Sequence, residues 1–424
     1  MAEARPTNPS ELERLRRRTV ATLVAGVALG STGHIAAVTV ATIVATHISG
    51  GTTAWSGAPS ATVVLGSAAG AVGLSWLMVR RGRRFGLAAG YVISVLGAIV
   101  ATVAVIVLSL PLLLIGTVLI GVGNSSNQLS RYVAADLAPP DRRASAIGLV
   151  VWGATIGAVA GPNLAAPAGR IALALGLPEL SGPYLVPIVF VGAAAVLSFV
   201  LLRPDPYALA DASSRHDGID GGEGSERSVA VSVASVLARP NVPVAMVALV
   251  AGQVVMVLIM TMTPIHMTSH GHDLAAVGFV ISGHTFGMFG LSPISGRFTD
   301  RFGSVPVILA GLGVLAIASV MAAAAPPNGG VVLFVALFLL GYGWNLGYVA
   351  GSALLTTGLS LAERTRVQGL TDGLIWSSAA VASLGSGLVL AYAGFAMLGL
   401  LGAALVVVPM LLVIARRSAV SGAI

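Results

Sequence analysis

The stretch AMVALVAGQVVMVLIMTMTPIHMTSHGHDLAAVGFVISGHTFGMFGLSPISGRFTDR, residues 245–301, decides the fold. Two apolar runs, each long enough to cross a bilayer, flank a short segment rich in histidine. We therefore predict two membrane-spanning helices joined by a short outer loop. Similar apolar runs recur along almost the whole chain, which predicts a helical membrane protein that crosses the bilayer many times.

Composition extends this prediction to the rest of the chain. Of 424 residues, 56% are hydrophobic and 9% are charged, and the mean hydropathy is +0.93. These values exclude a soluble domain. The absence of cysteine excludes disulfides and thiolate metal sites. The net charge of +7 comes from loop arginines without interleaved aromatic residues, so we expect no nucleic-acid partner.

Twelve apolar spans can be counted, and a polar stretch separates the sixth from the seventh. They lie near residues 19–46, 56–79, 85–109, 111–137, 144–169, 184–203, 240–267, 274–297, 304–325, 330–357, 368–393 and 395–415. We predict an all-α membrane protein with a six-helix half at 1–203, a linker at 204–239 and a second six-helix half at 240–424. The linker is rich in glycine, serine and charges of both signs, which is typical of a mobile segment.

Arginine clusters lie at the termini and in alternate loops, whereas the other loops hold only Arg170. The positive-inside rule then places both termini and the linker in the cytoplasm. We expect a monomer in the lipid bilayer of a bacterial cytoplasmic membrane. No phosphate-binding glycine loop and no nucleophile–base pair is found, so we expect neither an enzyme nor a resident cofactor.

The two halves repeat one another in sequence. Arg80 and Gly82 match Arg301 and Gly303 at an offset of 221 residues, and Arg143 matches Arg364 at the same offset. Coincidences at one spacing in separate places indicate an internal structural repeat, which is common in transporters.

The segment from Gly296 to Gly303, with Asp300 and Arg301, resembles the loop motif of the major facilitator superfamily, although Val79 stands at the aspartate position of the first half. This resemblance implies the major facilitator fold and a secondary transporter that works by alternating access. It also implies a charge network at the cytoplasmic helix ends, for which ordinary loop-anchoring charges are the alternative. The residues concerned are Arg80, Gly82, Arg84, Asp136, Arg143, Asp300, Arg301, Gly303 and Arg364.

Soft ligand residues repeat at helical spacing in the opening stretch. Met256 and Met260 are spaced i, i+4, as are His284 and Met288. A rise of about 1.5 Å per residue puts Met256 and His284 level at the midplane, on neighbouring helices. Thioethers and an imidazole suit Cu(I). Methionine also fills gaps between helices, and a histidine bonded to a nearby carbonyl is the alternative for His284.

This MxxxM and HxxxM pattern resembles the CcoA-like copper importers of the same superfamily. The resemblance implies that Met256 and His284 are the principal ligands of transported copper and that Met260 and Met288 assist them. In the loop, His266, His270 and His272 are either a metal-gathering group at the outer mouth or solvated residues.

A second hypothesis is a transporter of a small organic solute, either a vitamin such as riboflavin or an exported drug. Its candidate binding residues are His34, Asn124, Asn127, Trp344 and Asn345, with helix packing as the alternative. Acidic residues are expected only toward cytoplasmic helix ends, Asp372 among them. If transport is coupled to protons, His34 or His284 would therefore have to titrate.

Overall fold

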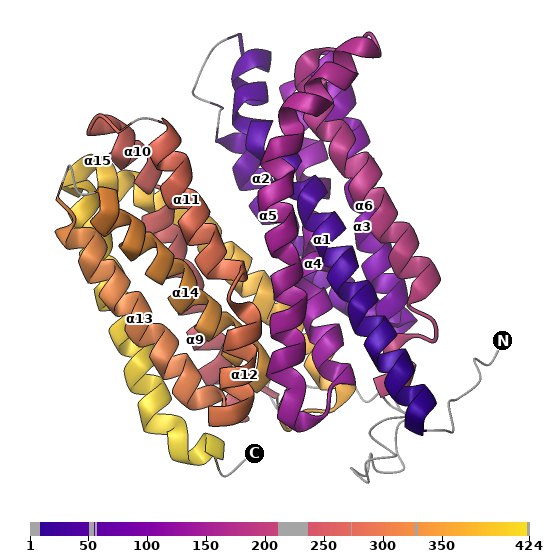
Figure 1. Ribbon diagram of the computed structural model, residues 1–424, viewed down its shortest axis with the longest axis vertical. Coiled ribbons are helices and arrows are strands. Elements are labelled where there is room, and N and C mark those ends of the chain that lie inside the picture. Colours follow the sequence, from indigo (N-terminus) through magenta and orange to yellow (C-terminus); the bar gives the residue numbers. More distant parts are fainter. Residues whose placement is uncertain are drawn as a thin grey trace. The chain divides into compact units, whose positions relative to one another are not determined.

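The structure is a computed structural model that describes residues 9–50, 55, 57–210, 236–272, 274–326 and 330–421. The described regular elements are all helices (Figure 1). The long helices before residue 211 are α1 (Pro9–Ile48), α2 (Ala58–Arg81), α3 (Arg83–Ile106), α4 (Leu110–Leu137), α5 (Arg143–Ala174) and α6 (Gly182–Leu201), and short 3-10 turns lie at Pro140–Arg142 and Glu179–Ser181. Most of the expected linker, residues 211–235, lies outside the described residues.

The later helices are more interrupted. They are α9 (Asn241–Met260), α10 (Thr263–Ser269), α11 (Leu274–Phe289), α12 (Ser292–Phe302), α13 (Ser304–Ala324), α14 (Gly330–Leu354) and α15 (Leu361–Ser421). Among the described residues, 11 stretches are long and apolar enough to cross a membrane. The last of them covers two helices, because the backbone of Gly394 is not helical. The predicted twelve-helix membrane fold is therefore confirmed.

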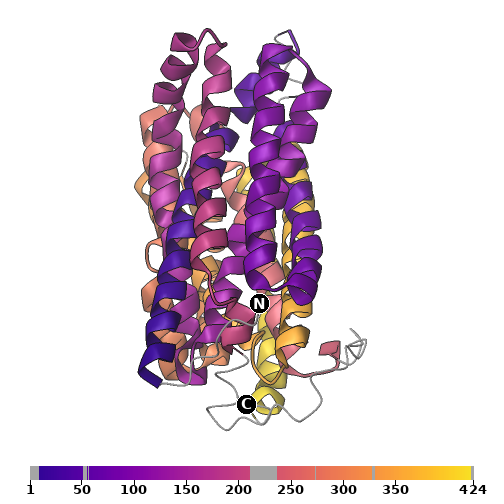
Figure 2. The same cartoon turned by 90° about the vertical axis from the view of Figure 1, so that its right-hand side faces the viewer.

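The described residues form two compact units, and within each unit the helices run alongside one another (Figures 1 and 2). Unit 1 contains 9–138, 153–210 and 360–376, and unit 2 contains 139–152, 236–359 and 377–421. The units thus differ from the two sequence halves in two segments. The first residues of α5 belong to unit 2, and the first residues of α15 belong to unit 1.

Small residues let the helices of each unit approach closely. In unit 1, α3 packs on α4 and α6, while α2 packs on α4. A Cβ atom at Gly66 or Gly121 would overlap the backbone of the facing helix at Val118 or Val63. In unit 2, α14 packs against α9, α11 and α13. Such contacts provide the dispersion energy that holds helices together where lipid is as apolar as the side chains.

Prolines explain why the seventh and eighth spans are each broken into two helices. Pro264 lies just after the start of α10, and Pro293 just after the start of α12. Proline lacks the N–H that would bond to the carbonyl four residues earlier, and its ring crowds that carbonyl. The carbonyl oxygens of Met288 and Phe289 therefore need other donors, since water is scarce at membrane depth.

Asn345 of α14 closes the break between α11 and α12. Its amide nitrogen donates to the carbonyl oxygen of Met288 at 2.6 Å and to the hydroxyl of Ser292 at 2.7 Å. The Ser292 hydroxyl donates to the carbonyl of Phe289 at 2.8 Å. Ser295 donates to the amide oxygen of Asn345 at 2.6 Å. One side chain thus satisfies, directly or through Ser292, both carbonyls that the break releases.

Asn345→Leu should lower the free energy of unfolding by about 1–3 kcal/mol, because it leaves buried polar groups without a partner. Thermal unfolding of the purified protein in detergent measures this loss. Thr102→Val is the matched control, since the buried Thr102 hydroxyl bonds only to Ala98 of its own helix. Equal unfolding temperatures for the two variants would contradict the role assigned to Asn345.

Candidate functional site

The predicted copper ligands all lie in unit 2 and differ in burial. Met256 is buried and Met260, the last residue of α9, is half-buried. On α11, His284 is fully buried and Met288 is half-buried. His284 Nδ1 lies 2.8 Å from the carbonyl oxygen of Leu337 on α14. A carbonyl only accepts, so Nδ1 carries the proton, and the lone pair is on Nε2. That Nε2 atom is buried and has no hydrogen-bond partner.

The helices that carry these residues pack on α14. Both α9 and α11 contact α14 extensively, whereas no extensive direct packing of α9 on α11 is found among the described residues. The sequence predicts Met256 and His284 on neighbouring helices, and in the structure both of their helices pack on α14. The bond from His284 to Leu337 is also the packing contact that the sequence left as an alternative.

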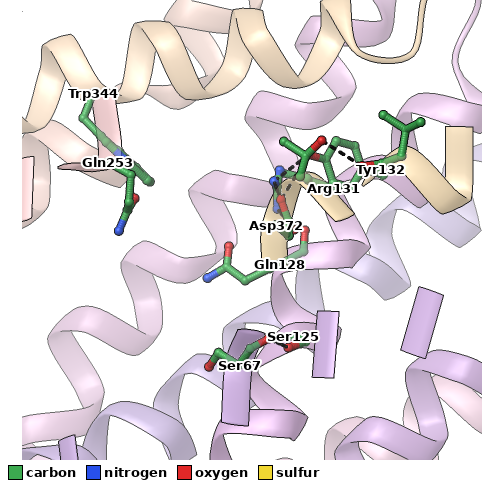
Figure 3. A network of polar contacts seen from close by, with 10 residues as sticks. Ser67, Ser125, Gln128, Arg131, Tyr132, Gln253, Trp344 and Asp372 are labelled. Atoms are coloured by element: carbon green, nitrogen blue, oxygen red, sulfur yellow. Dashed lines mark hydrogen bonds and ion pairs between the residues drawn. The ribbon is translucent and has the colours of Figure 1, made fainter. Parts of the chain in front are cut away.

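An aromatic cluster surrounds another predicted residue, Trp344, in the same unit. Its indole N–H donates to the side-chain oxygen of Gln253 at 2.8 Å (Figure 3). Tyr348 stacks on Trp344 with ring centroids 4.4 Å apart, and Phe289 meets Trp344 edge-on at 6.0 Å. The indole bond uses the amide oxygen of Gln253 and leaves its amide nitrogen as a donor. This cluster combines a flat apolar surface with a polar edge.

In unit 1, the polar residues of α4 mostly tie helices together. The Ser125 hydroxyl donates to the backbone oxygen of Ser67 at 2.7 Å (Figure 3). Asn124 donates to the Ser67 hydroxyl at 3.4 Å, and Tyr91 donates to the amide oxygen of Asn127 at 3.0 Å. The geometry matches the packing alternative for Asn124 and for the amide oxygen of Asn127.

His34 stands apart from these bonds. It lies on α1 and is half-buried, and its Nδ1 atom is enclosed without a hydrogen-bond partner. A buried polar atom in this state is costly and is a candidate for ligand contact. Asn345 shows the opposite situation, because its amide is engaged by the break between α11 and α12.

The residues of the predicted charge network lie at one end of each unit. We call this end the motif end and define it by residues 80–84 in unit 1 and 300–304 in unit 2. In unit 1 the buried Arg83 bonds to Asp136 at 2.6 Å and to the side-chain oxygen of Gln368 at 2.9 Å. Arg364 reaches the second oxygen of Asp136 at 3.8 Å. Asp136 and Arg364 were predicted, whereas Arg83 and Gln368 were missed as its central members.

At the motif end of unit 2, Asp300 caps α5. Its two carboxylate oxygens accept the backbone N–H groups of Ala144 and Ser145 at 3.0 and 2.9 Å. An anion is favourable there because the N-terminus of a helix carries partial positive charge and unpaired N–H donors. Arg143 is the first residue of α5. Val79 holds the position of this aspartate in the first half, where the Arg83 network occurs instead.

The two glycines matched by the sequence repeat share one unusual backbone conformation. Gly82 has a φ of +90° and Gly303 has a φ of +87°, and residues other than glycine rarely adopt these backbone angles. A Cβ atom at Gly82 would also overlap the carboxylate of Asp205, which accepts the N–H groups of Arg83 and Arg84. Burial raises the pKa of the Asp205 carboxyl, while backbone N–H donors, among them that of Tyr207, oppose the rise.

The remaining motif arginines lie against aromatic rings. Arg80 lies over the ring of Trp76 at 3.8 Å, and Arg301 is 5.4 Å from the ring centre of Phe302. Arg84 lies 4.5 Å over Phe199 and donates to its backbone oxygen at 2.8 Å. Cation–π contacts of this kind anchor arginine at a membrane surface.

A buried ion pair in unit 1 was missed from the sequence. Arg131 of α4 binds Asp372 through two nitrogens, at 2.6 and 3.1 Å, and both residues are 1% exposed (Figure 3). Tyr132 bonds to both partners, at 2.8 Å to Arg131 and 3.2 Å to Asp372. The signal was an arginine inside an apolar span, which is costly unless it is paired.

This pair corrects the expectation that Asp372 lies toward a helix end. Asp372 is 11 residues beyond Leu361, the first residue of α15. At about 1.5 Å per residue that places it roughly 16 Å along the helix. The part of the chain that the structure describes therefore holds a deeply buried carboxylate within a membrane-spanning helix.

Comparison with known proteins gives one family. The profile of the Major Facilitator Superfamily matches residues 20–383 and 244–423. An uncharacterized MFS-type transporter of Bacillus subtilis, YdeG, is 37% identical over 399 residues, which are 93% of this chain and 91% of that protein. The riboflavin transporter RfnT of Brucella anthropi is 27% identical over 368 residues, 85% of this chain and 86% of that protein.

Solved structures with the same fold include a proton:xylose symporter, XylE, and the human organic anion transporter MFSD10. The TM-score with XylE is 0.75 at 14% identity, over 94% of this chain and 95% of that one. With MFSD10 it is 0.71 at 16% identity, over 94% and 99%. Similarity at this identity shows the fold alone.

Asp372→Leu should lower the free energy of unfolding by about 3–5 kcal/mol, because it leaves the Arg131 charge buried without its partner. The double variant Arg131→Met with Asp372→Leu should regain most of that loss. Thermal unfolding of the purified protein measures both effects.

Glu13→Ala is the control for this double variant, since the pair of Glu13 and Arg17 is exposed on α1 and such a pair contributes about 0–1 kcal/mol. If the double variant were no more stable than Asp372→Leu alone, the pair would not be the source of the loss.

Proposed function

We propose that this protein transports a small organic solute. The proposal starts from its family, since the chain belongs to the Major Facilitator Superfamily and is a secondary transporter of that type. The solute carries a flat aromatic ring system with hydrogen-bonding groups at its edge, as riboflavin does. The observation that carries this proposal is the cluster of Trp344, Tyr348 and Phe289 with Gln253.

The cluster fits such a cargo for two physical reasons. Stacked rings give a flat, rigid surface on which another ring system can stack, at little cost in conformational entropy. The bond from Trp344 fixes the Gln253 amide, so its nitrogen can donate to a carbonyl oxygen at the edge of the solute. The flat ring surface and the amide donor are thus provided by a small group of residues, as is usual for a specific ligand site.

The similarity to the riboflavin transporter RfnT supports the same solute class. At 27% identity it supports a class rather than a single compound. We also propose that the transporter is a monomer of a bacterial cytoplasmic membrane with both termini in the cytoplasm, on the basis of the arginine distribution in its loops.

A second candidate cargo is Cu(I), and one observation favours it. The Nδ1–H of His284 is held by the Leu337 carbonyl, which leaves a lone pair on the unpartnered Nε2. Metal-binding histidines are commonly fixed in this way by a bond at the other nitrogen. The packing of α9 and α11 on α14, rather than on each other, is the reason that we place copper second.

Riboflavin should raise the unfolding temperature of the purified protein, because a ligand that binds only the folded state stabilises it. Trp344→Ala should weaken this binding by about five- to 150-fold, as expected for the loss of about 1–3 kcal/mol of stacking. Trp344→Phe should retain part of the effect, since it keeps a ring and loses the bond to Gln253.

Trp152→Ala is the matched control, because Trp152 of α5 is exposed and lies outside the cluster. Unchanged riboflavin binding in Trp344→Ala, or no stabilisation of the parent protein by riboflavin, would reject the organic-solute proposal in this form.

A second experiment tests Cu(I) as the cargo by measuring copper bound to the purified protein under reducing conditions. If copper is the cargo, the purified parent protein retains copper, and both His284→Ala and Met256→Ala lose it while Trp344→Ala keeps it. Metal content measured by mass spectrometry decides this. Absence of bound copper from the parent protein would remove the second candidate.

A further inference from the structure

A cavity of about 490 Å³ opens in unit 2 at the end opposite its motif end. It lies between α10, the last turn of α13 and the bend of α15 at Gly394; α10 and α15 are labelled close together in Figure 1. Its wall includes His266, Ser269, His270, Leu390, Gly394 and Phe395. We propose that this pocket binds one divalent transition-metal ion of the Zn²⁺ and Cu²⁺ class through the imidazoles of His266 and His270.

The two histidines are placed as a chelating pair. His266 lies in the last turn of α10 and His270 directly follows its last residue, so the two side chains leave the chain at the same end of the helix. Their ring centroids are 4.4 Å apart and the ring planes are tilted by 53°. Two imidazoles at this spacing can bind the same ion with only small changes in side-chain torsions.

One nitrogen of His270 is already fixed. Its Nδ1 lies 2.8 Å from the backbone oxygen of His266, so Nδ1 donates its proton and the lone pair is on Nε2. Ser269 donates to the same carbonyl at 2.8 Å. A bond from one ring nitrogen to a backbone carbonyl is the usual way in which a protein orients a histidine that binds metal through the other.

The ring of His266 is held by an aromatic contact. It stacks on Phe395 with centroids 4.2 Å apart and planes within 10°. Phe395 is buried and follows directly after the bend at Gly394, so it is a fixed wall. Both imidazoles are therefore oriented before any ion binds, which lowers the entropic cost of binding.

The donor set selects the ion class. None of the described residues that line the pocket carries a carboxylate, which disfavours Ca²⁺ and Mg²⁺, while neutral imidazoles suit Zn²⁺ and Cu²⁺. Among the described residues, no group of three or more histidine, cysteine, aspartate or glutamate side chains is close enough to hold a metal ion. Water must therefore complete the coordination, and the site is suited to an ion that exchanges with the surrounding solution.

This site is separate from the proposed cargo site. None of Trp344, Gln253, Met256 and His284 lines the pocket. Metal binding here is thus independent of whether the transported solute is riboflavin-like, and the two proposals can fail separately.

The full-length protein, purified without a polyhistidine tag, should bind one equivalent of Zn²⁺ in competition with a chromophoric chelator. His266→Ala and His270→Ala should each weaken this binding by more than about tenfold, because each removes one of two protein ligands. His47→Ala is the matched control, since His47 is an exposed histidine in the last turn of α1, in unit 1.

Cu²⁺ provides a second readout that a purely structural role would not change. The electron paramagnetic resonance spectrum of one bound Cu²⁺ should show coupling to two imidazole nitrogens in the parent protein and in His47→Ala, and to fewer in either pocket variant. Unfolding temperatures equal to that of the parent establish that the variants are folded. If the Zn²⁺ affinity and the Cu²⁺ spectra were unchanged in His266→Ala and His270→Ala, the proposal would be overturned, whether or not the protein binds riboflavin.

Discussion

The scarcity of water at membrane depth is the constraint on which the rest of this structure depends. A carbonyl released by proline has to find a donor from the protein, and the break at Pro293 is tolerated because Asn345 and Ser292 supply it. The same requirement draws serine hydroxyls of α4 onto the backbones of neighbouring helices. Many polar side chains that appear available for a solute in the sequence are therefore engaged in holding helices.

Charges obey the same constraint more strictly, and this determines which segments pack together. Asp372 binds Arg131, and Gln368 binds Arg83, so the first turns of α15 belong to unit 1. Asp300 binds the first N–H groups of α5, which places those residues in unit 2. Each compact unit thus includes a segment from the other sequence half. Buried charged groups hold these segments, and leaving such a group without its partner would cost several kcal/mol.

The chemistry of the candidate sites depends on which donor and acceptor atoms of each side chain are not used in bonds within the protein. Asn345 has both ends of its amide engaged, whereas Gln253 keeps a donor and His284 keeps a lone pair. The stacked rings of Trp344 and Tyr348 add a surface that a metal ion does not need and a flat organic solute does. Together with the packing of α9 and α11 on α14 rather than on each other, this surface is why we propose the organic solute ahead of Cu(I).

The sequence by itself determined the twelve spans and the internal repeat, including the match of Gly82 with Gly303, because hydropathy and residue spacing are local properties. It also located Asp136, Asp300 and Arg364. Only the tertiary structure paired Arg131 with Asp372, which lie 241 residues apart, and showed the bond from His284 to Leu337. Whether a buried polar residue is free to bind a solute depends on partners far along the chain, and one-dimensional spacing carries no information about them.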